Sequence, residues 1–268
     1  MSAAADPDLG TGRRGRTAAR NLVSIGALAH VLVAAVFCVA PAAPSDRSWS
    51  QAPPPDAGPG APTAAATRWH ETFAQAPRGF ESPSGHDAAT IARVYAVGQD
   101  DRGSPLLRAR HDGAPRAGHT PPPAVHYGRP FRDGPHPLPG ACLLRWRWRV
   151  HQHPAVADDP WQDLAASVYV MMRPPGLVRG GKGFKFGWLA KPGPAGTTQR
   201  GMLQVELRHD PAGPTWHTEQ VDLCALYRQT YGDPSEEQIL YIGVVTDADN
   251  SRSLAAADYA DFRLLASP

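Results

Sequence analysis

The sequence predicts an all-β fold, an antiparallel jelly-roll-like sandwich of two sheets. The first reason is a series of about eight short apolar runs separated by turn residues, which is typical of such sandwiches. The second reason is the composition, because 29 prolines and 26 glycines in 268 residues favour short elements joined by many turns over a helical bundle. The third reason is that only residues 222–231, DLCALYRQTY, have the pattern of a helix.

The N-terminal segment predicts export. Residues 13–20 are basic, residues 22–40 are almost uninterrupted apolar, and small residues follow as far as residue 42. This order is typical of a secretory signal peptide over residues 1–42. An uncleaved membrane anchor is the alternative, since the 19 residues of the apolar run are just long enough to span a bilayer. In both cases the basic residues stay on the cytoplasmic side of the membrane. We therefore expect the following chain in the periplasm or attached to the cell envelope.

A spacer and one folded domain follow. Residues 43–67 are rich in proline, alanine and glycine, which predicts a disordered spacer. Residues 68–268 form the expected β-sandwich domain, and its Pro/Gly-rich stretch 112–141 is expected to be a long surface loop.

The clearest strand is residues 142–150, CLLRWRWRV. Its apolar residues and its arginines alternate with a period of two, so one face is apolar and the other is charged. The apolar face carries Trp146 and Trp148, which we therefore expect in the core rather than in a sugar site. The other strand candidates are residues 91–97, 106–110, 165–172, 184–190, 202–208, 239–246 and 259–265.

The charge of the domain disfavours one class of partner. Residues 1–42 hold four arginines and two aspartates of the 27 basic and 25 acidic residues, so the remaining chain is formally neutral. A neutral domain has no overall field to attract nucleic acid, and we expect no nucleic-acid partner. A membrane contact is expected only through the N-terminal segment, if that segment is not cleaved.

The folded domain keeps two of the three cysteines, because Cys38 lies in the targeting segment. Cys142 and Cys224 are expected as two buried free thiols. A disulfide between them is the alternative, which an oxidising compartment would permit.

Several stretches together resemble the bacterial domain-of-unknown-function family 3047. They are LRWRWRV, DLAASVYV, GWLAKP, WHTEQVD, ILYIGVVTDADN and AAADYADFRL, and the resemblance covers roughly residues 90–268. It implies an exported β-sandwich domain without an established activity. The chain departs from the family pattern where Asp163 stands alone instead of a double acid, where Ser167 replaces an arginine, and at Ser251-Arg252-Ser253. A site that relatives build from these positions would be altered here.

The sharpest local motif is TDADN at residues 246–250, directly after an apolar strand. Oxygen ligands at alternating positions suit a hard cation, so Asp247, Asp249 and Asn250 are candidate calcium ligands. The motif lacks the glycine and the distal glutamate of a calcium loop. A turn in which these side chains bond backbone amides is therefore the alternative.

Two places are candidates for ligand binding. Trp188 stands beside glycines and near lysines, as a ligand-contacting aromatic at a loop edge would, and a position in a small satellite core is the alternative. Arg145 and Arg147 lie on the charged face of their strand, where like charges repel each other unless acids or ligands meet them. An anionic-ligand groove is one interpretation of this face, since guanidinium groups suit anions, and a solvated surface is the other.

Candidates for catalysis are few. Asp163, Glu219 and Asp222 are the carboxylates near predicted strand ends, and a glycosidase needs two carboxyl groups a few ångströms apart. The chain contains no nucleophile elbow, phosphate loop, dinucleotide fingerprint or zinc-protease motif. We therefore expect a non-enzymatic exported domain that binds carbohydrate or cell-envelope glycan. A glycan-processing hydrolase or lyase and an envelope scaffold are the alternatives.

Overall fold

The computed structural model describes residues 65–118, 120–156, 159–174, 180–194, 196–197 and 201–266. These residues belong to one compact unit, 57–268. The predicted signal segment and nearly all of the predicted spacer lie outside the described residues. Within the described part of the chain, no helix has the length and apolar character needed to cross a membrane.

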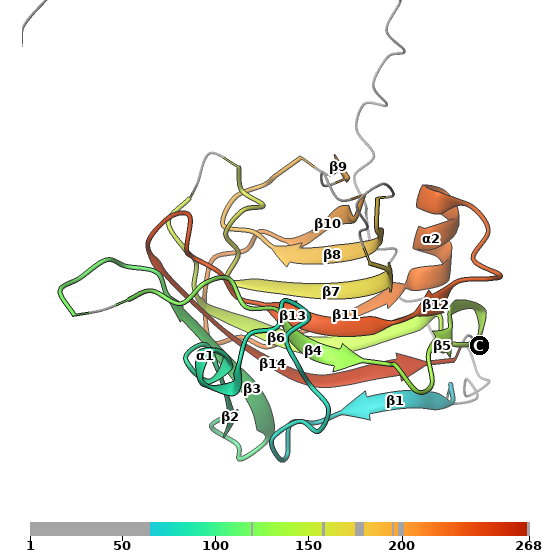
Figure 1. Cartoon of the computed structure of the whole chain (residues 1–268), viewed down its shortest axis with the longest axis horizontal. Coiled ribbons are helices and arrows are strands. Elements are labelled where there is room, and N and C mark those ends of the chain that lie inside the picture. The colour runs from blue at the N-terminus through green and yellow to red at the C-terminus, as the bar shows by residue number, and fades with distance from the viewer. Residues whose placement is uncertain are drawn as a thin grey trace, which may run out of the picture. The chain divides into compact units, whose positions relative to one another are not determined.

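The fold is a sandwich of two large sheets, as the sequence predicts (Figure 1). The first sheet has the order β11-β6-β14-β3-β2, with β1 also paired to β14, and all its pairs are antiparallel. Its strands are β1 (Thr67–Glu71), β2 (Tyr95–Gln99), β3 (Pro105–Asp112), β6 (Leu143–Gln152), β11 (His217–Asp222) and β14 (Leu254–Leu265).

The second sheet has the order β4-β13-β7-β8-β10-β9. Its strands are β4 (Tyr127–Pro130), β7 (Ala166–Arg173), β8 (Lys182–Trp188), β9 (Gly196–Thr197), β10 (Leu203–Arg208) and β13 (Tyr241–Val245). Strands β8 and β10 pair in parallel, so the second sheet is mixed at this pair, whereas the sequence predicts antiparallel sheets. The chain returns to the same end of the sheet before β10 begins, and a parallel neighbour is the result.

The predicted loop 112–141 has more structure than expected. It contains β4, the short strand β5 (His136–Pro137), which pairs with β12 (Gln238–Ile239), and the 3-10 turn η1 (Leu138–Gly140). β4 pairs with β13 and β5 pairs with β12, which satisfies the backbone N–H and C=O groups of this stretch. The turn-rich composition does not reveal this pairing.

Helices are short and few. The predicted helix is confirmed as α2 (Leu223–Tyr231), which begins where the Asp222 carboxylate accepts a hydrogen bond from the Ala225 amide. The one-turn helix α1 (Ala88–Ala92) overlaps a region that we expected to be strand from residue 91. Asp87 caps it by accepting a hydrogen bond from the Thr90 amide. A helical turn therefore forms here, although apolar and polar residues alternate weakly.

The core lies between the sheets, and β6 supplies its centre. Trp146 and Trp148 are fully buried, which confirms that the apolar face of this strand points inward. They contact rings of the opposite sheet, with Trp146 5.6 Å from Phe186 and Trp148 5.7 Å from Trp188 between ring centroids. Each buried indole removes on the order of 150–250 Å² from water, or about 4–6 kcal/mol of transfer free energy.

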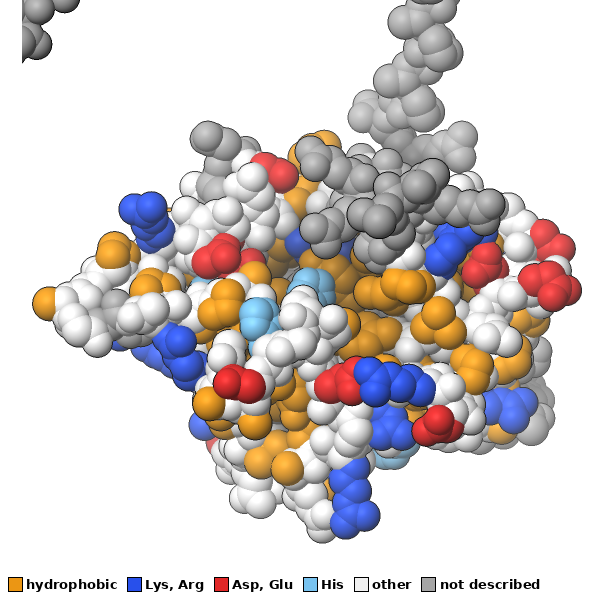
Figure 2. Space-filling model, viewed as in Figure 1, with side chains coloured by type: hydrophobic (Ala, Val, Ile, Leu, Met, Phe, Trp, Pro, Cys, Tyr) orange, Lys and Arg blue, Asp and Glu red, His pale blue; other side chains and the backbone are white. Residues whose placement is uncertain are grey.

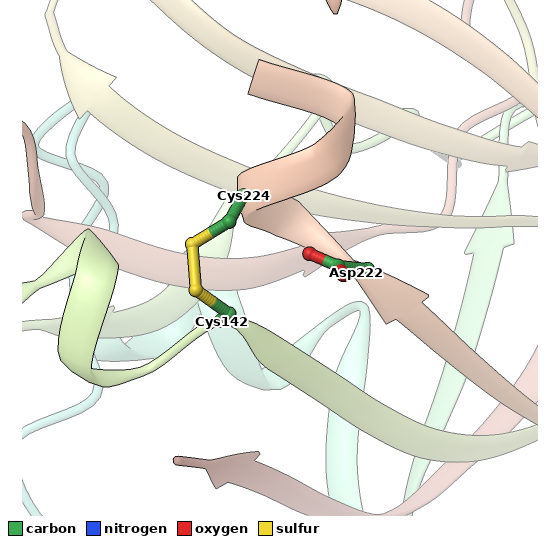
Figure 3. A group of neighbouring side chains, drawn as sticks. All are labelled: Cys142, Asp222 and Cys224. Atoms are coloured by element: carbon green, nitrogen blue, oxygen red, sulfur yellow. A yellow bond between two sulfur atoms is a disulfide. The ribbon is translucent and has the colours of Figure 1, made fainter. Parts of the chain in front are cut away.

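Cys142 and Cys224 form a disulfide, so the expectation of two free thiols was wrong. Figure 3 shows the bridge joining the start of β6 to the first turn of α2, with Asp222 beside it. The Cα atoms are 5.2 Å apart, within the range that a disulfide needs. The bridge closes a loop between residues 82 positions apart and holds α2 against the sandwich.

Candidate functional site

The outer face of the first sheet carries the predicted arginines. Since β6 alternates, Arg145, Arg147 and Arg149 all lie on the side opposite the buried tryptophans. Arg149 is itself buried and binds the carboxylate of Asp258 through two nitrogens, at 2.9 Å (Nε) and 2.8 Å (Nη2). In the described part of the chain, no carboxylate lies within ion-pair distance of Arg145 or Arg147. The three arginines therefore differ, and only Arg149 has its buried acid.

Trp216, just before β11, lies over these arginines. The guanidinium carbons of Arg147 and Arg149 are each 4.8 Å from the centroid of its ring, a distance at which cation and π-system attract. The indole is partly exposed, and its N–H has no hydrogen-bond partner among the described residues. An aromatic ring is thus held in place at the surface by two guanidinium groups.

A pocket of about 320 Å³ opens beside this ring. We call it the arginine–tryptophan groove, and its lining is Asp100, Asp101, Arg102, Arg147, Arg149, Pro214, Thr215 and Trp216. Burial raises the pKa of Asp100, but hydrogen bonds from the Ser104 and Arg102 amides outweigh it and hold that pKa below its ordinary value. The charges of Arg149 and Arg147 also lower the pKa of Asp100. The groove therefore combines a π-face, guanidinium groups and a charged carboxylate.

The second candidate region is an acidic group at the other sheet. Asp163 precedes β7, and Asp247 and Asp249 follow β13. Because β7 and β13 are antiparallel neighbours, the start of one meets the end of the other. One carboxylate oxygen from each of the three aspartates lies within 4.8 Å of the others. The structure thus joins a residue predicted as catalytic to two predicted as metal ligands.

The contacts within this acidic group fit both interpretations of the TDADN motif. Asp247 Oδ1 accepts the Asp249 amide at 3.1 Å, as in the predicted turn. Asn250 donates its side-chain nitrogen to Asp163 at 3.0 Å and to Asp249 at 2.6 Å. The aspartates keep further lone pairs that could hold a hard cation. The calcium site at Asp247, Asp249 and Asn250 stays a prediction.

Burial dominates the electrostatics of the acidic group. Burial, together with the charges of Asp249 and Asp163, raises the pKa of Asp247 to about 7, while Lys185 opposes the shift. Burial also lowers the pKa of Lys185 to about 8. The Lys185 ammonium donates to the Trp161 carbonyl at 2.7 Å. Two buried groups with displaced pKa values in one place are typical of functional sites, although ion-pair networks produce them too.

The three predicted catalytic carboxylates do not act together. Glu219 is buried and accepts hydrogen bonds from Trp148 Nε1 at 3.0 Å and Arg208 Nε at 2.6 Å. Asp222 caps α2, and Asp163 belongs to the acidic group. Glu219 and Asp222 therefore have structural partners on β11 and at the start of α2.

Trp188 is not a surface ligand contact, which corrects that prediction. Its side chain is 1% exposed and packs on Trp148, and its indole donates to the Asp210 carbonyl at 2.9 Å. It is the last residue of β8 and points into the sandwich. Sequence reasoning missed Trp216 instead. The available signal was its place between the turn residues 211–215 and an alternating strand.

Comparisons with known proteins give one family match. Residues 196–263 match the model of the family described as "Protein of unknown function (DUF3047)". No curated protein matches the chain. A solved structure, the K1 cleaved adhesin domain of Lys-gingipain from Porphyromonas gingivalis W83, is similar over 75% of this chain and 98% of its own.

The likeness to that adhesin domain is weak, with 12% sequence identity and a TM-score of 0.37. At this level it indicates neither a shared ligand nor a shared activity. The family match, by contrast, covers β9 to most of β14 and includes the WHTEQVD and TDADN stretches. It confirms, over these residues, the resemblance seen in the sequence to this family of unknown function.

Proposed function

We propose that this chain is an exported domain that binds an acidic glycan in the arginine–tryptophan groove. The observation that carries the proposal is that Trp216 is held partly exposed over Arg147, a guanidinium group with no carboxylate within ion-pair distance in the described structure. An aromatic face packs against the apolar face of a sugar ring. A guanidinium group binds a carboxylate with paired, charge-assisted hydrogen bonds.

The remaining lining supports a sugar with a carboxylate rather than a simple anion. Asp100 and Asp101 line the groove beside the arginines, with Asp101 3.8 Å from Arg149. Carboxylates there accept hydrogen bonds from sugar hydroxyls, which a simple inorganic anion lacks. A uronic acid offers both an anionic group for Arg147 and hydroxyls for the aspartates.

Export is part of the proposal and rests on two features. The sequence predicts a signal segment over residues 1–42, and the Cys142–Cys224 disulfide suits an oxidising compartment. The acidic glycan would then be met in the periplasm or at the cell envelope.

The enzymatic alternative has one candidate catalytic site, the acidic group. Asp163, Asp247 and Asp249 bring carboxylates within 4.8 Å, and Asp247 has the raised pKa of a general acid. A glycan hydrolase or lyase using this group would release reducing ends from polygalacturonate, and Asp247→Asn would abolish the release. The scaffold alternative has less support. The exposed large hydrophobic residues among those described, Val97 and Val156, are single side chains rather than a patch.

Calorimetric titration of the full chain with trigalacturonate and with neutral maltotriose tests the proposal. We expect binding of the acidic trisaccharide only, and at least about tenfold weaker binding by Trp216→Ala, as for an aromatic anchor at an interface. Val97→Ala, which truncates an exposed hydrophobic residue of the same sheet, should leave the affinity unchanged. Equal affinity of the wild type and Trp216→Ala would refute the proposed site.

A further inference from the structure

The outer face of the first sheet carries further arginines beside the groove. Arg145 precedes Arg147 by two residues on β6, and Arg263 of β14 is the direct cross-strand partner of Arg145. Each of the three is only partly buried and stands between buried neighbours in its strand, so its side chain lies on the outer face. We call these three residues the arginine row. The row begins at the groove, because Arg147 lines that pocket.

The arginine row places like charges close together. Residues two positions apart on one strand are about 7 Å from each other, and direct cross-strand partners have Cβ atoms about 4.5–5.5 Å apart. In the described part of the chain, only Arg263 has a carboxylate within ion-pair distance, with its Nε 2.9 Å from Asp261 Oδ1. The same oxygen also lies 2.7 Å from His70 Nε2. Like charges in register destabilise a sheet unless an opposite charge meets them, so the row suits an anionic ligand.

The strand beside the row offers neutral polar side chains. On β11, Thr218 is the partner of Arg147, and Gln220 is the partner of Arg145. Both side chains are exposed. A hydroxyl and an amide each donate and accept hydrogen bonds, as the hydroxyls of a sugar do. On the other side of β6, Ala260 is the partner of Arg147, and its methyl group does not cover the row. Guanidinium groups flanked by neutral hydrogen-bonding groups suit a sugar acid.

The centre of the opposite face of the sandwich has a different character. Figure 2 shows hydrophobic side chains gathered there, over β4, β7 and β13. The outward residues of β7 and β13 include Tyr169, Met171 and Tyr241, since their neighbours in each strand belong to the core. A polyanion is therefore expected on the outer face of the first sheet, where the groove already lies.

We propose that the arginine row extends the groove into a second anionic subsite, so that the ligand is a polyuronate chain rather than a short acidic sugar. The inference rests on the proposed function, because it takes the groove as the first subsite. A polyuronate carries a carboxylate on every ring, so a chain that begins in the groove presents further carboxylates to Arg145 and Arg263. Guanidinium groups bind carboxylates through charge-assisted hydrogen bonds. The affinity therefore increases with the length of the chain.

Calorimetric titration of the full chain with digalacturonate and with hexagalacturonate tests the row. The disaccharide reports on the groove, and the hexasaccharide reports on the groove and the row together. The wild type should bind the hexasaccharide at least about tenfold more tightly, the equivalent of one further charge-assisted hydrogen bond. Arg145→Ala should lose most of this preference. Its unfolding midpoint should equal that of the wild type, because no described carboxylate pairs with Arg145.

Arg110→Ala is the matched control. It removes the same charge from an exposed position on β3 of the same sheet, outside the row, and should keep the preference for the hexasaccharide. If the wild type binds neither galacturonate, the acidic-glycan site and the row are overturned together. If digalacturonate binds but the wild type does not prefer the hexasaccharide, or if Arg145→Ala keeps the preference, the row is overturned and the groove stands. An equal loss in Arg110→Ala also overturns the row, because the overall charge of the face would then explain the preference.

Discussion

The fully buried carboxylate of Asp258 binds Arg149 through both Nε and Nη2, at 2.9 and 2.8 Å. The two residues are direct partners across strands β14 and β6. His151 adds a third contact to the same carboxylate at 2.8 Å. This network neutralises one arginine of the charged face of β6, which helps the face to tolerate like charges in register. Among the described residues, Arg147 has no carboxylate within ion-pair distance.

Asp258→Ala should strongly destabilise the protein, because Arg149 would then be buried without its acid. The expected loss is about 3–5 kcal/mol of unfolding free energy, as when one partner of a buried ion pair is removed. Chemical denaturation at pH 7 measures it. Asp101→Ala is the control, since Asp101 is exposed and lies 3.8 Å from Arg149. A loss below 1 kcal/mol for Asp258→Ala would contradict a structural role for the pair.

The same carboxylate predicts acid sensitivity. Burial raises the pKa of Asp258, but His151 and Arg149 outweigh burial and hold it below its ordinary value. A lowered folded-state pKa stabilises the protein above the unfolded value of about 4 and loses that effect as pH falls through the folded pKa. Unfolding free energy should therefore decrease below about pH 4. The unfolding free energy of an Asp258→Asn variant should decrease less with falling pH than that of the wild type.

Asp247 predicts the opposite pH dependence. Because its folded pKa is raised to about 7, the native protein holds this proton more tightly than the unfolded chain. Its contribution to stability falls as pH rises from about 4 to 7. In the presence of a chelator, Asp247→Asn should be more stable than the wild type at pH 8, by about 1–3 kcal/mol. Equal unfolding midpoints at pH 8 would show that Asp247 ionises without cost.

Calcium should stabilise the protein if the acidic group holds it. Binding to the native state at 100 times the dissociation constant adds about 2.7 kcal/mol, which raises the midpoint by several degrees in a domain of this size. Asp249→Asn should abolish the rise, and Asp261→Asn, outside the group, should keep it. An unchanged midpoint on adding calcium to the wild type would identify TDADN as a turn.

The disulfide should contribute a large part of the stability. Cys142→Ser with Cys224→Ser should lower the unfolding free energy by about 2–4 kcal/mol, the usual effect of losing a bridge that closes a long loop. Thermal unfolding with and without reductant measures the same effect in the wild type. If reductant lowers the midpoint of the double variant as well, the loss does not come from this bridge.

The features that local sequence patterns could predict were those with a strict period. The alternation in β6 correctly placed Trp146 and Trp148 in the core, and the apolar run before TDADN predicted β13. Trp188 shows the limit of this reasoning. Glycines around it suggested a loop, but Gly187 is packed against the Trp161 and Leu164 side chains on the sheet surface.

Long-range pairing was beyond prediction from one sequence. Asp163 meets Asp247 only because β7 and β13 are neighbours, and nothing local specifies that pairing. The parallel pair β8 and β10 and the Cys142–Cys224 bridge depend on the path of the chain in the same way. Of the arginine–tryptophan groove, the sequence predicted Arg147 but not Trp216, because Trp216 comes from the end of a different strand.

The most direct test of the acidic-glycan site compares trigalacturonate with its methyl ester, which has the same shape without the charge. Dissociation constants are measured by calorimetry for the full chain, for Arg147→Ala, and for Arg110→Ala, an exposed arginine of the same sheet. We predict that the wild type and Arg110→Ala bind the acid at least about tenfold more tightly than the ester, the equivalent of one charge-assisted hydrogen bond. Arg147→Ala should bind both alike. Retention of the full preference for the acid by Arg147→Ala would contradict the account.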